Sequence, residues 1–395
     1  MTGNTRVVVV GGGYAGVMAA NRLTRRGDVT VTLINSRPAF VERIRLHQMV
    51  AGNYDASADY ARLLAKGVDL VVDTVTGIDA GDRVVTLAGG GTARYDYLIY
   101  AVGSVGAAPG VPGAAEFAYS LDTLEEARRL RQVIDATPAT APVTVVGAGL
   151  TGIETAAELA ETGRPVTLVC GDVLAPSLHP RGRRAVAERL ARLGVTVLEG
   201  PGATVTAVTG DAVRLGDGRR LASRVTVWAA GLGVPDLARR SGLSTDATGR
   251  LRTDETLTSL DDPRIVAAGD AAAPSDLPYR MSCAAAIQMG PQAAETVLAR
   301  IEGRHPRPVE VGFLGQCLSL GRSAGMIQFS RRNDTVTRHH LGGRTGARIK
   351  EAICRGTIWL LSNEARRPGA RDLWARDRTR RRLVADRRGE PALTR

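Results

Sequence analysis

A glycine-rich turn of the kind that cradles phosphates occurs twice in this chain, each time between a β-branched run and an amphipathic segment. The first turn, GGGYAG, spans residues 11–16, and the second, GAGLTG, spans residues 147–152. In the pattern G-x-G-x-x-G the first glycine permits the tight turn, the second lets backbone amides approach a pyrophosphate, and the third lets the helix pack on the strand. The N-terminus of the helix adds a positive dipole. Two strand–turn–helix units therefore predict two nucleotide-binding sites.

The segments around the two turns repeat the same order. A second strand closes each βαβ unit, at residues 29–34 (VTVTLI) and 166–170 (VTLVC). Later in each unit an apolar run stops at a glycine, at Gly103 in the first and at Gly231 in the second. Strands that alternate with helical segments are typical of parallel sheets. The chain is therefore predicted to be an α/β protein with two Rossmann-like dinucleotide-binding domains.

Composition fits a multidomain enzyme. The 395 residues exceed one ordinary domain, and 44% of them are apolar and 23% charged, which is typical of globular chains. The four cysteines are far apart and form no CxxC pair, so neither a zinc site nor a dithiol centre is predicted. No apolar run reaches the ~18 residues of a membrane span, and the first strand starts at Arg6, too early for a signal peptide. We expect a cytoplasmic protein without a metal site.

Much of the net charge of +12 lies near the C-terminus. Residues 366–395 hold eleven arginines, no lysine and four acidic residues. Such a segment is either a solvated, partly helical tail or an electrostatic anchor for a phosphate-rich surface, and we favour the tail. The segment lacks the interleaved aromatic residues of a single-strand binder. We therefore expect no nucleic-acid partner.

The ribose position, which separates NADH from NADPH in such sites, is unusual in both units. The acid expected about 20 residues after the turn is absent from each. Asn35 ends the second strand of the first unit, and Cys170 ends that of the second unit, with Asp172 two positions later. The three arginines of residues 181–184 are candidates for a 2′-phosphate, although solvated surface arginines are commoner. The sequence leaves NADH and NADPH both open.

Four features together resemble the pyridine nucleotide-disulphide oxidoreductase superfamily and, within it, the type II NADH dehydrogenase-like branch. Two are the glycine turns. The others are the strand YLIYAVGS, which is similar to the family's A-x-G motif at Ala101 to Gly103, and IVAAGD at residues 265–270, which is similar to its late G-D motif. The resemblance implies FAD at the first turn, a nicotinamide cofactor at the second, and contact between Asp270 and the ribityl chain of the flavin.

The same resemblance implies an FAD domain that is split by the inserted nicotinamide domain. The predicted boundaries are 1–110 and 245–304 for the FAD domain, 111–244 for the NAD(P)H domain, 305–365 for a small C-terminal α+β region, and 366–395 for the basic tail. The residues predicted to bind cofactors are Gly11, Gly13, Ala15, Gly16, Asn35, Arg43, Ala101, Gly103, Gly147, Gly149, Gly152, Asp172, Gly231, Gly269 and Asp270.

Two residues are predicted to be catalytic from the resemblance. Relatives with redox thiols keep them near residues 40–48, which contain no cysteine here, so disulphide and persulphide chemistry is disfavoured. Glu154 matches a glutamate that relatives place near nicotinamide and flavin, and Gln288 matches the last residue of the A-Q-x-A-x-Q motif beside quinone. The first glutamine of that motif is Ala284 here, which removes one polar quinone contact. A dipole-favoured carboxylate and an ordinary polar helix position are the alternative explanations.

The segment 347–361 predicts an apolar helix that includes Ile353 and Trp359 and is flanked by arginines. Type II enzymes dock on membranes through amphipathic helices of this kind. Packing on the protein's own core or on a second subunit explains the pattern equally well, and we favour packing. Peripheral contact with the inner face of the cell membrane and a homodimer both stay open.

The sequence thus predicts an FAD-dependent oxidoreductase that passes hydride from NADH or NADPH to FAD and then electrons to a quinone or another small organic acceptor. Because the cofactor carries the chemistry, no catalytic triad or metal is needed. One alternative is a soluble flavoenzyme that acts on a small metabolite in a biosynthetic pathway. The other is a non-catalytic redox-sensing flavoprotein, against which the intact second turn argues, since a sensor needs no nicotinamide site.

Overall fold

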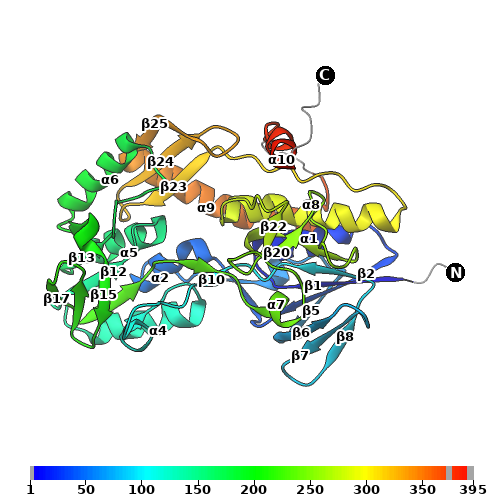
Figure 1. Ribbon diagram of the computed structural model, residues 1–395, viewed down its shortest axis with the longest axis horizontal. Helices are drawn as coiled ribbons and strands as arrows, with labels where there is room; N and C mark the ends of the chain where they lie inside the picture. Colours follow the sequence, from blue (N-terminus) through cyan, green and yellow to red (C-terminus); the bar gives the residue numbers. More distant parts are fainter. Residues whose placement is uncertain (1–3, 371–375, 389–395) are drawn as a thin grey trace.

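Two five-stranded parallel sheets form two α/β units at opposite ends of the long axis of the molecule (Figure 1). A computed structural model of the protein describes residues 4–370 and 376–388. The first sheet consists, in spatial order, of β21 (Ile265–Ala267), β9 (Tyr97–Tyr100), β1 (Thr5–Val10), β2 (Val29–Asn35) and β5 (Val68–Val72). The second consists of β11 (Ala118–Tyr119), β18 (Val225–Trp228), β12 (Val143–Val146), β13 (Val166–Val169) and β14 (Thr196–Leu198). The predicted α/β fold with two Rossmann-type sheets is confirmed.

The two units are repeats of one arrangement. In each, the strand before the glycine turn is central, with the second strand on one side and the strand that ends near Gly103 or Gly231 on the other. A three-stranded antiparallel sheet then follows in each unit. These strands are β6 (Val75–Asp79), β7 (Val84–Leu87) and β8 (Thr92–Arg94) in the first unit, and β15 (Val205–Val208), β16 (Ala212–Leu215) and β17 (Arg220–Ala222) in the second.

The chain crosses between the units twice. The two crossings lie together, because β10 (Val105–Gly106) pairs antiparallel with β19 (Leu232–Gly233). After the second crossing β21 returns to the first sheet, where Ile265 pairs with Leu98. The first unit is therefore completed by residues that follow the second unit in the sequence.

The helices that follow the glycine turns are α1 (Tyr14–Leu23) and α5 (Leu150–Glu161). The other helices are α2 (Leu46–Val50), α3 (Ala114–Phe117), α4 (Leu124–Ala136), α6 (Pro180–Arg192), α7 (Leu237–Arg240), α8 (Cys283–Ile301), α9 (Gly343–Arg366) and α10 (Arg380–Arg388). Short 3-10 turns occur at Arg43–Arg45, Tyr60–Arg62, Pro201–Ala203 and Gly269–Ala271. The small two-stranded sheets are β3 (Ala39–Val41) with β4 (Ser57–Asp59), and β20 (Leu251–Thr253) with β22 (Ala272–Pro274). Among the described residues no helix combines the length and hydropathy needed to span a bilayer.

The C-terminal region combines α9 with the antiparallel strands β23 (Gly315–Ser319), β24 (Gly325–Ser330) and β25 (Val336–Gly342). The helix packs on the protein's own core, but its inward face is mostly polar and consists of Gly346, Lys350, Cys354, Thr357, Leu361 and Glu364. Ile353 and Trp359, predicted to belong to an apolar packing face, are 41% and 48% exposed. The helix takes this orientation because Lys350 and Glu364 have buried ion-pair partners.

Part of the basic tail is not solvated as predicted. Arg380 is buried and forms a two-pronged ion pair with Glu255, at 2.8 and 2.9 Å, while its guanidinium lies 4.2 Å above the ring of Tyr279. Val384 is also buried. Residues 376–388 therefore dock on the first unit, beside the end of the segment that leads into α8 (Figure 1). The remaining tail residues of the prediction, 371–375 and 389–395, lie outside the described part of the chain.

Candidate active site

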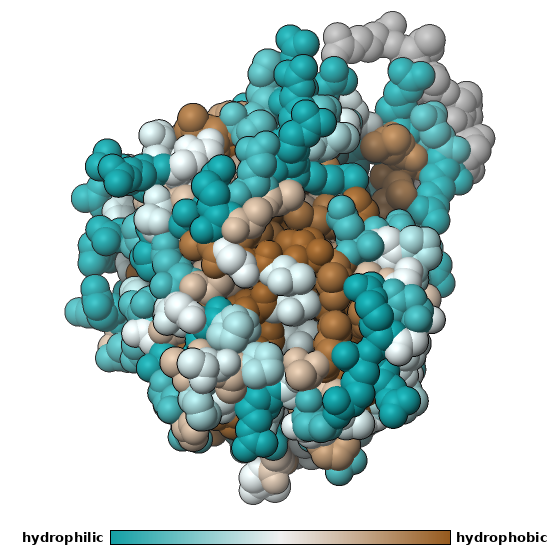
Figure 2. Space-filling view, turned by 90° about the vertical axis from the view of Figure 1, so that its left-hand side faces the viewer, coloured by the Kyte–Doolittle hydropathy of each residue, from teal (hydrophilic) through white to brown (hydrophobic). Residues whose placement is uncertain are grey.

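A cleft of about 1250 Å³ lies between the two units and takes its walls from both of them. This volume exceeds the roughly 300–1,000 Å³ of most small-ligand pockets. The carboxyl ends of β9, β12 and β18 and the first residues of α1, α5 and α8 line it. Parallel α/β sheets bind ligands at this end of their strands. The molecular face at the second unit shows apolar side chains in a hollow that hydrophilic side chains surround (Figure 2).

The first and third glycines of each turn are required by close backbone packing. Gly11 and Gly147 have φ angles of 101° and 135°, and a Cβ on either would collide with the carbonyl oxygen of Ala101 or Ala229 on the neighbouring strand end. A Cβ on the third glycine, Gly16 in the first turn, would meet the carbonyl of the first glycine, and Gly152 repeats this contact in the second turn. Gly11, Gly16 and Gly152 shape the turns without lining the cleft, whereas Gly147 also lines it.

The middle glycines face the cleft. Gly13 and Gly149 both line it, and an added Cβ would have no protein atom within 4 Å. Each glycine also precedes the first residue of a helix, α1 or α5, whose free amides point toward the turn. Two equivalent cradles of open backbone at helix N-termini therefore fit the pyrophosphates of two dinucleotides.

The late G-D motif lies beside the first turn, where a Cβ added to Gly269 would come within 3.1 Å of the Cβ of Ala15. The Asp270 carboxylate accepts hydrogen bonds from the hydroxyl of Ser104 at 2.7 Å and from the backbone amide of Ser282 at 2.9 Å. Arg43 donates to the carbonyl of Ser104 at 2.7 Å. All four side chains line the cleft, as do the predicted cofactor residues Ala15, Ala101, Gly103, Gly231 and Gly269.

Three predicted site residues outside the glycine turns do not line the cleft. Asn35 accepts a hydrogen bond from the amide of Gly12 at 2.9 Å and so holds the glycine turn from behind. The side chain of Asp172 is exposed, and its backbone carbonyl accepts a hydrogen bond from the amide of Gly200. Gln288 is buried in α8 with its amide bonded to backbone groups of Ala284 and Gly312. The catalytic prediction for Gln288 is not supported, because these bonds turn its side chain toward the segment before β23.

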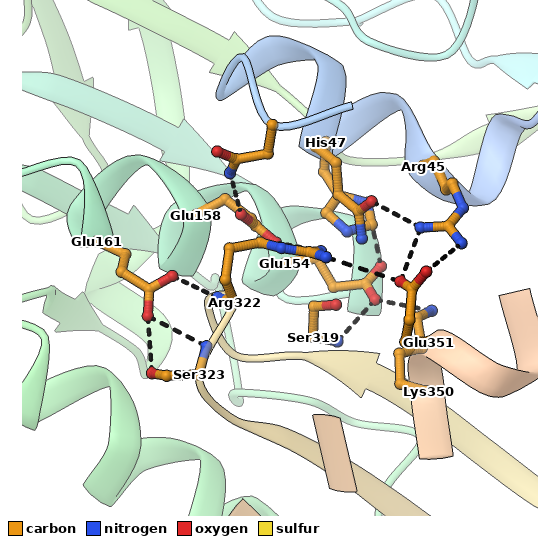
Figure 3. Close-up of polar contacts among 12 residues, drawn as sticks. Arg45, His47, Glu154, Glu158, Glu161, Ser319, Arg322, Ser323, Lys350 and Glu351 are labelled. Carbon is orange, nitrogen blue, oxygen red and sulfur yellow. Dashed lines mark hydrogen bonds and ion pairs between the residues drawn. The ribbon is translucent and has the colours of Figure 1, made fainter. Parts of the chain in front are cut away.

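Glu154, the other predicted catalytic residue, lies at the junction of the two units and lines the cleft (Figure 3). Its carboxylate lies 3.0 Å from Nζ of Lys350 on α9 and accepts a hydrogen bond from the amide of Ser319 at 2.9 Å. Burial is the largest influence and raises the pKa of Glu154, but Lys350, His47 and the amide of Ser319 together hold the pKa below its ordinary value. Burial lowers the pKa of Lys350, and Glu154 in turn holds it above its ordinary value. Both groups are therefore charged at neutral pH.

His47 from α2 completes this cluster. Its Nδ1 lies 3.7 Å from Glu154, and its Nε2 is buried without a hydrogen-bond partner in the described part of the chain. Burial lowers the pKa of His47 to about 4, so the imidazole is neutral at physiological pH. A neutral imidazole with one free nitrogen at a cleft wall offers a hydrogen bond to a ligand.

Three of the four cysteines, which the sequence analysis treated as unrelated, meet at the cleft. Cys283, Cys317 and Cys354 line it beside Lys350. Burial raises the pKa of Cys283 to about 12 and of Cys354 to about 11, so these thiols stay protonated. Within the described residues, no group of histidine, cysteine and acidic side chains is arranged to hold a metal ion. The protonated thiols therefore form an uncharged part of the cleft wall.

Sequence reasoning missed Lys350 because it lies in no recognisable local motif. Lys350 follows an isoleucine in a helix that looked like an apolar one. A lysine within an apolar helical segment is the one signal that pointed to it, since lysine is rarely buried without a partner.

The protein has two parallel sheets, and their phosphate cradles open into one cleft. This arrangement is typical of oxidoreductases that bind two dinucleotides, a flavin and a nicotinamide cofactor. The model of the pyridine nucleotide-disulphide oxidoreductase family matches residues 5–290, and the chain belongs to this family. It is an oxidoreductase that uses FAD and NAD(P)H.

Curated relatives agree with this assignment. The chain is 34% identical over 358 residues to a NADH dehydrogenase-like protein of Mycobacterium tuberculosis, covering 82% of this chain and 87% of that protein. It is 30% identical to a type II NADH:quinone oxidoreductase of the same organism, covering 76% of this chain and 74% of that protein.

Solved structures share the fold. NDH2 of Plasmodium falciparum in complex with NADH superposes with a TM-score of 0.75 at 15% identity, covering 93% of this chain and 99% of that one. The sulfide:quinone oxidoreductase of Aquifex aeolicus reaches a TM-score of 0.77 at 20% identity, covering 92% and 93% of the two chains.

Proposed function

We propose that the protein passes hydride from NAD(P)H to FAD and then two electrons to a quinone or another small organic acceptor. The observation that carries the proposal is the single cleft into which both phosphate cradles and the charged Glu154–Lys350 pair open. The printed names of two relatives, a type II NADH:quinone oxidoreductase and a demethylphylloquinone reductase, support a quinone. Bound FAD would supply the redox chemistry, accepting hydride from one substrate and releasing electrons to the other.

The residues of the first unit fit FAD. We propose that the amides around Gly13 and the N-terminus of α1 bind its pyrophosphate. Asp270, held by Ser104 and the amide of Ser282, presents a carboxylate that accepts hydrogen bonds from sugar-like hydroxyls. The equivalent cradle at Gly149 then binds the pyrophosphate of NAD(P)H, which brings the nicotinamide toward Glu154.

We further propose a preference for NADH over NADPH. Cys170 lines the cleft at the ribose position. Glu199 directly follows the adjacent strand β14, and its carboxylate accepts a hydrogen bond from the amide of Leu174 at 2.9 Å. Glu199 adds to burial in raising the pKa of Cys170 to about 12, so a negative charge acts at this position. Arg183 is already bonded to backbone carbonyls of residues 176 and 178. A 2′-phosphate at Cys170 would therefore lie near the carboxylate of Glu199. The bonded nitrogens of Arg183 would not be free to bind this phosphate.

Exchange of Glu199 tests the preference. Glu199→Arg is expected to raise kcat/KM for NADPH relative to NADH about tenfold, equivalent to ~1.4 kcal/mol. Glu188 is also exposed in the second unit, so Glu188→Arg is the control for the added charge. An unchanged ratio in the Glu199 variant would remove this residue from cofactor selection.

The central test follows the flavin. The purified protein should show flavin absorbance, and anaerobic NADH should bleach it within the turnover time. A quinone, a ferredoxin and oxygen, added separately, then identify the oxidant. Flavin that neither NADH nor NADPH bleaches would contradict the enzyme and leave the redox-sensing alternative. Bleaching without reoxidation by any quinone would favour a different small metabolite as acceptor.

We also propose peripheral contact between α9 and the inner face of the cell membrane. Ile353 and Trp359 are exposed on this helix, together with Arg344, Arg348 and Arg355, which suits an anionic lipid surface. Trp359→Glu is expected to reduce sedimentation with anionic liposomes and to leave the protein's size in solution unchanged. A change from dimer to monomer in this variant, with equal liposome binding, would assign α9 to a homodimer interface instead.

A further inference from the structure

The proposed reaction needs a proton from solvent. NAD(P)H delivers two electrons and one proton as hydride, whereas a quinone takes up two electrons and two protons when both of its oxygens become hydroxyls. One proton per turnover must therefore enter the cleft from solvent, and side chains that connect the buried Glu154 with the surface are candidates to carry it.

Helix α5 carries three carboxylates on one face. Glu154, Glu158 and Glu161 are spaced four and three residues apart, so they lie above one another on the helix surface (Figure 3). Glu154 lines the cleft, and Glu161 lies at the opposite end, where it binds the amide and hydroxyl of Ser323 at the surface. Glu158 lies between them, with a side chain that is 0% exposed.

Glu158 is buried without a strong counter-charge. One carboxylate oxygen accepts a hydrogen bond from Asn53 at 2.7 Å, and the other has no hydrogen-bond partner in the described part of the chain. Arg322 lies 3.7 Å from that second oxygen, and its side chain is 43% exposed. Glu158 therefore has two exposed polar residues, Asn53 and Arg322, beside its buried carboxylate.

The charges around Glu158 leave it able to exchange a proton near neutrality. Burial is the main influence and raises its pKa to about 7; Arg322 and Asn53 oppose the rise, and Glu161 and Glu154 add to it. From α9, Glu351 faces the same arginine at 3.7 Å, and from the first unit Arg45 binds Glu351. Glu154 itself stays ionised through Lys350, with the neutral His47 beside it.

We propose that Glu158 is the proton-loading group between solvent and the Glu154–His47 pair at the cleft. The inference rests on the proposed function and gives Glu158 a positioning role, since it acts through Glu154 and does not touch the substrate. A proton taken from solvent at Glu158 is passed toward Glu154 and from there to the acceptor oxygen, after which Glu158 is reprotonated from solvent.

The test separates the two halves of the reaction. Glu158→Gln is compared with Glu161→Gln, which removes a charge from the same helix face. In flavin-loaded enzyme, Glu158→Gln is expected to leave anaerobic bleaching by NADH within about twofold and to slow reoxidation by a water-soluble quinone roughly ten- to a hundredfold. The pH profile of reoxidation should lose its inflection near pH 7 in this variant only.

A second variant keeps the proposal testable if Glu158→Gln folds poorly. Arg322→Met removes the nearest cation and should move the inflection of the reoxidation profile to higher pH, because burial then acts unopposed by this charge. Reoxidation with an unchanged rate and profile in folded Glu158→Gln, or an unmoved inflection in Arg322→Met, would overturn the inference. A flavin that NADH fails to bleach in the wild type would instead overturn the proposed function.

A stability measurement supplies a readout without flavin. The pKa of Glu158 is raised from 4.5 to about 7 in the folded state, so stability falls as pH rises between these values, because the carboxyl ionises in the unfolded chain while the buried one stays protonated. The Tm of Glu158→Gln minus that of the wild type should therefore increase across this window. A difference that stays flat with pH would show that Glu158 does not titrate as the inference requires.

Discussion

At the residue scale, the glycines of each turn have separable roles. Gly11→Ala places a Cβ against the carbonyl of Ala101 at a φ of 101°, and should destabilise flavin-free protein by about 1–3 kcal/mol. The Cβ added by Gly13→Ala has no protein atom within 4 Å, so this variant should change the free energy of unfolding by less than about 0.5 kcal/mol while weakening flavin binding. Thermal unfolding and flavin titration measure the two effects.

Gly149→Ala is the matched control for Gly13→Ala. It occupies the same place in the second turn, so it should weaken NAD(P)H binding and leave flavin affinity unchanged. If Gly13→Ala and Gly149→Ala affect the same ligand, the assignment of one cofactor to each cradle is wrong.

The pair of Glu154 and Lys350 predicts a pH-dependent loss of stability. Lys350→Met leaves a buried carboxylate without its cation and should cost about 3–5 kcal/mol near neutral pH. With Lys350 gone, burial dominates and the pKa of Glu154 rises, so the deficit is present above that raised pKa and shrinks as pH falls through it. Chemical denaturation at about pH 8 and about pH 5 measures the change.

The double variant is the control for this pair. Glu154→Gln combined with Lys350→Met removes both charges and should be more stable near neutral pH than Lys350→Met alone. Additive losses in the double variant would show that the two side chains do not interact, since only coupled residues deviate from additivity.

At the element scale, a buried ion pair fixes how α9 sits on α1. Nε of Arg22 lies 2.5 Å from Glu364, and the two side chains are 1% and 3% exposed. Glu364→Gln should therefore lower the free energy of unfolding by about 3 kcal/mol. Glu302→Gln, which disturbs the partly exposed pair with Arg26, should cost less than about 1 kcal/mol. Equal shifts of the urea midpoint would mean that burial does not set the strength of these pairs.

The orientation of α9 also explains why its sequence was misleading. Its branched and aromatic residues predicted an apolar face that packs inward, yet Ile353 and Trp359 are exposed. The inward face instead carries Lys350 and Glu364, whose partners come from α5 and α1. The ion-pair partners of Lys350 and Glu364 lie on other helices, so the sequence of α9 alone could not predict that this face is buried.

At the scale of the whole molecule, the C-terminal segment supports the cleft from behind. Arg380 binds Glu255 and the carbonyls of Pro274 and Leu277, and it stacks on Tyr279, which precedes the cleft residue Arg280. Arg380→Met should accelerate flavin release several-fold, because the segment before α8 loses these bonds. Recovery of flavin fluorescence after dilution measures the rate.

Arg382→Met is the control for this prediction. The side chain of Arg382 is 82% exposed on the same helix, so its exchange removes the same charge without removing the buried contacts. Equal flavin release from both variants would attribute the effect to net charge and not to the docked segment.

What the sequence determined by itself is local. A G-x-G-x-x-G turn between a strand and a helix specifies its own backbone, so both phosphate cradles, the parallel sheets and the late motif at Asp270 were predicted from short segments. Distant partners were decided only by the tertiary structure. It pairs Glu154 with Lys350, 196 positions later in the chain, gathers three cysteines at one wall, and turns Gln288 away from the cleft. Burial and counter-charge depend on which elements meet, and that is a property of the folded chain.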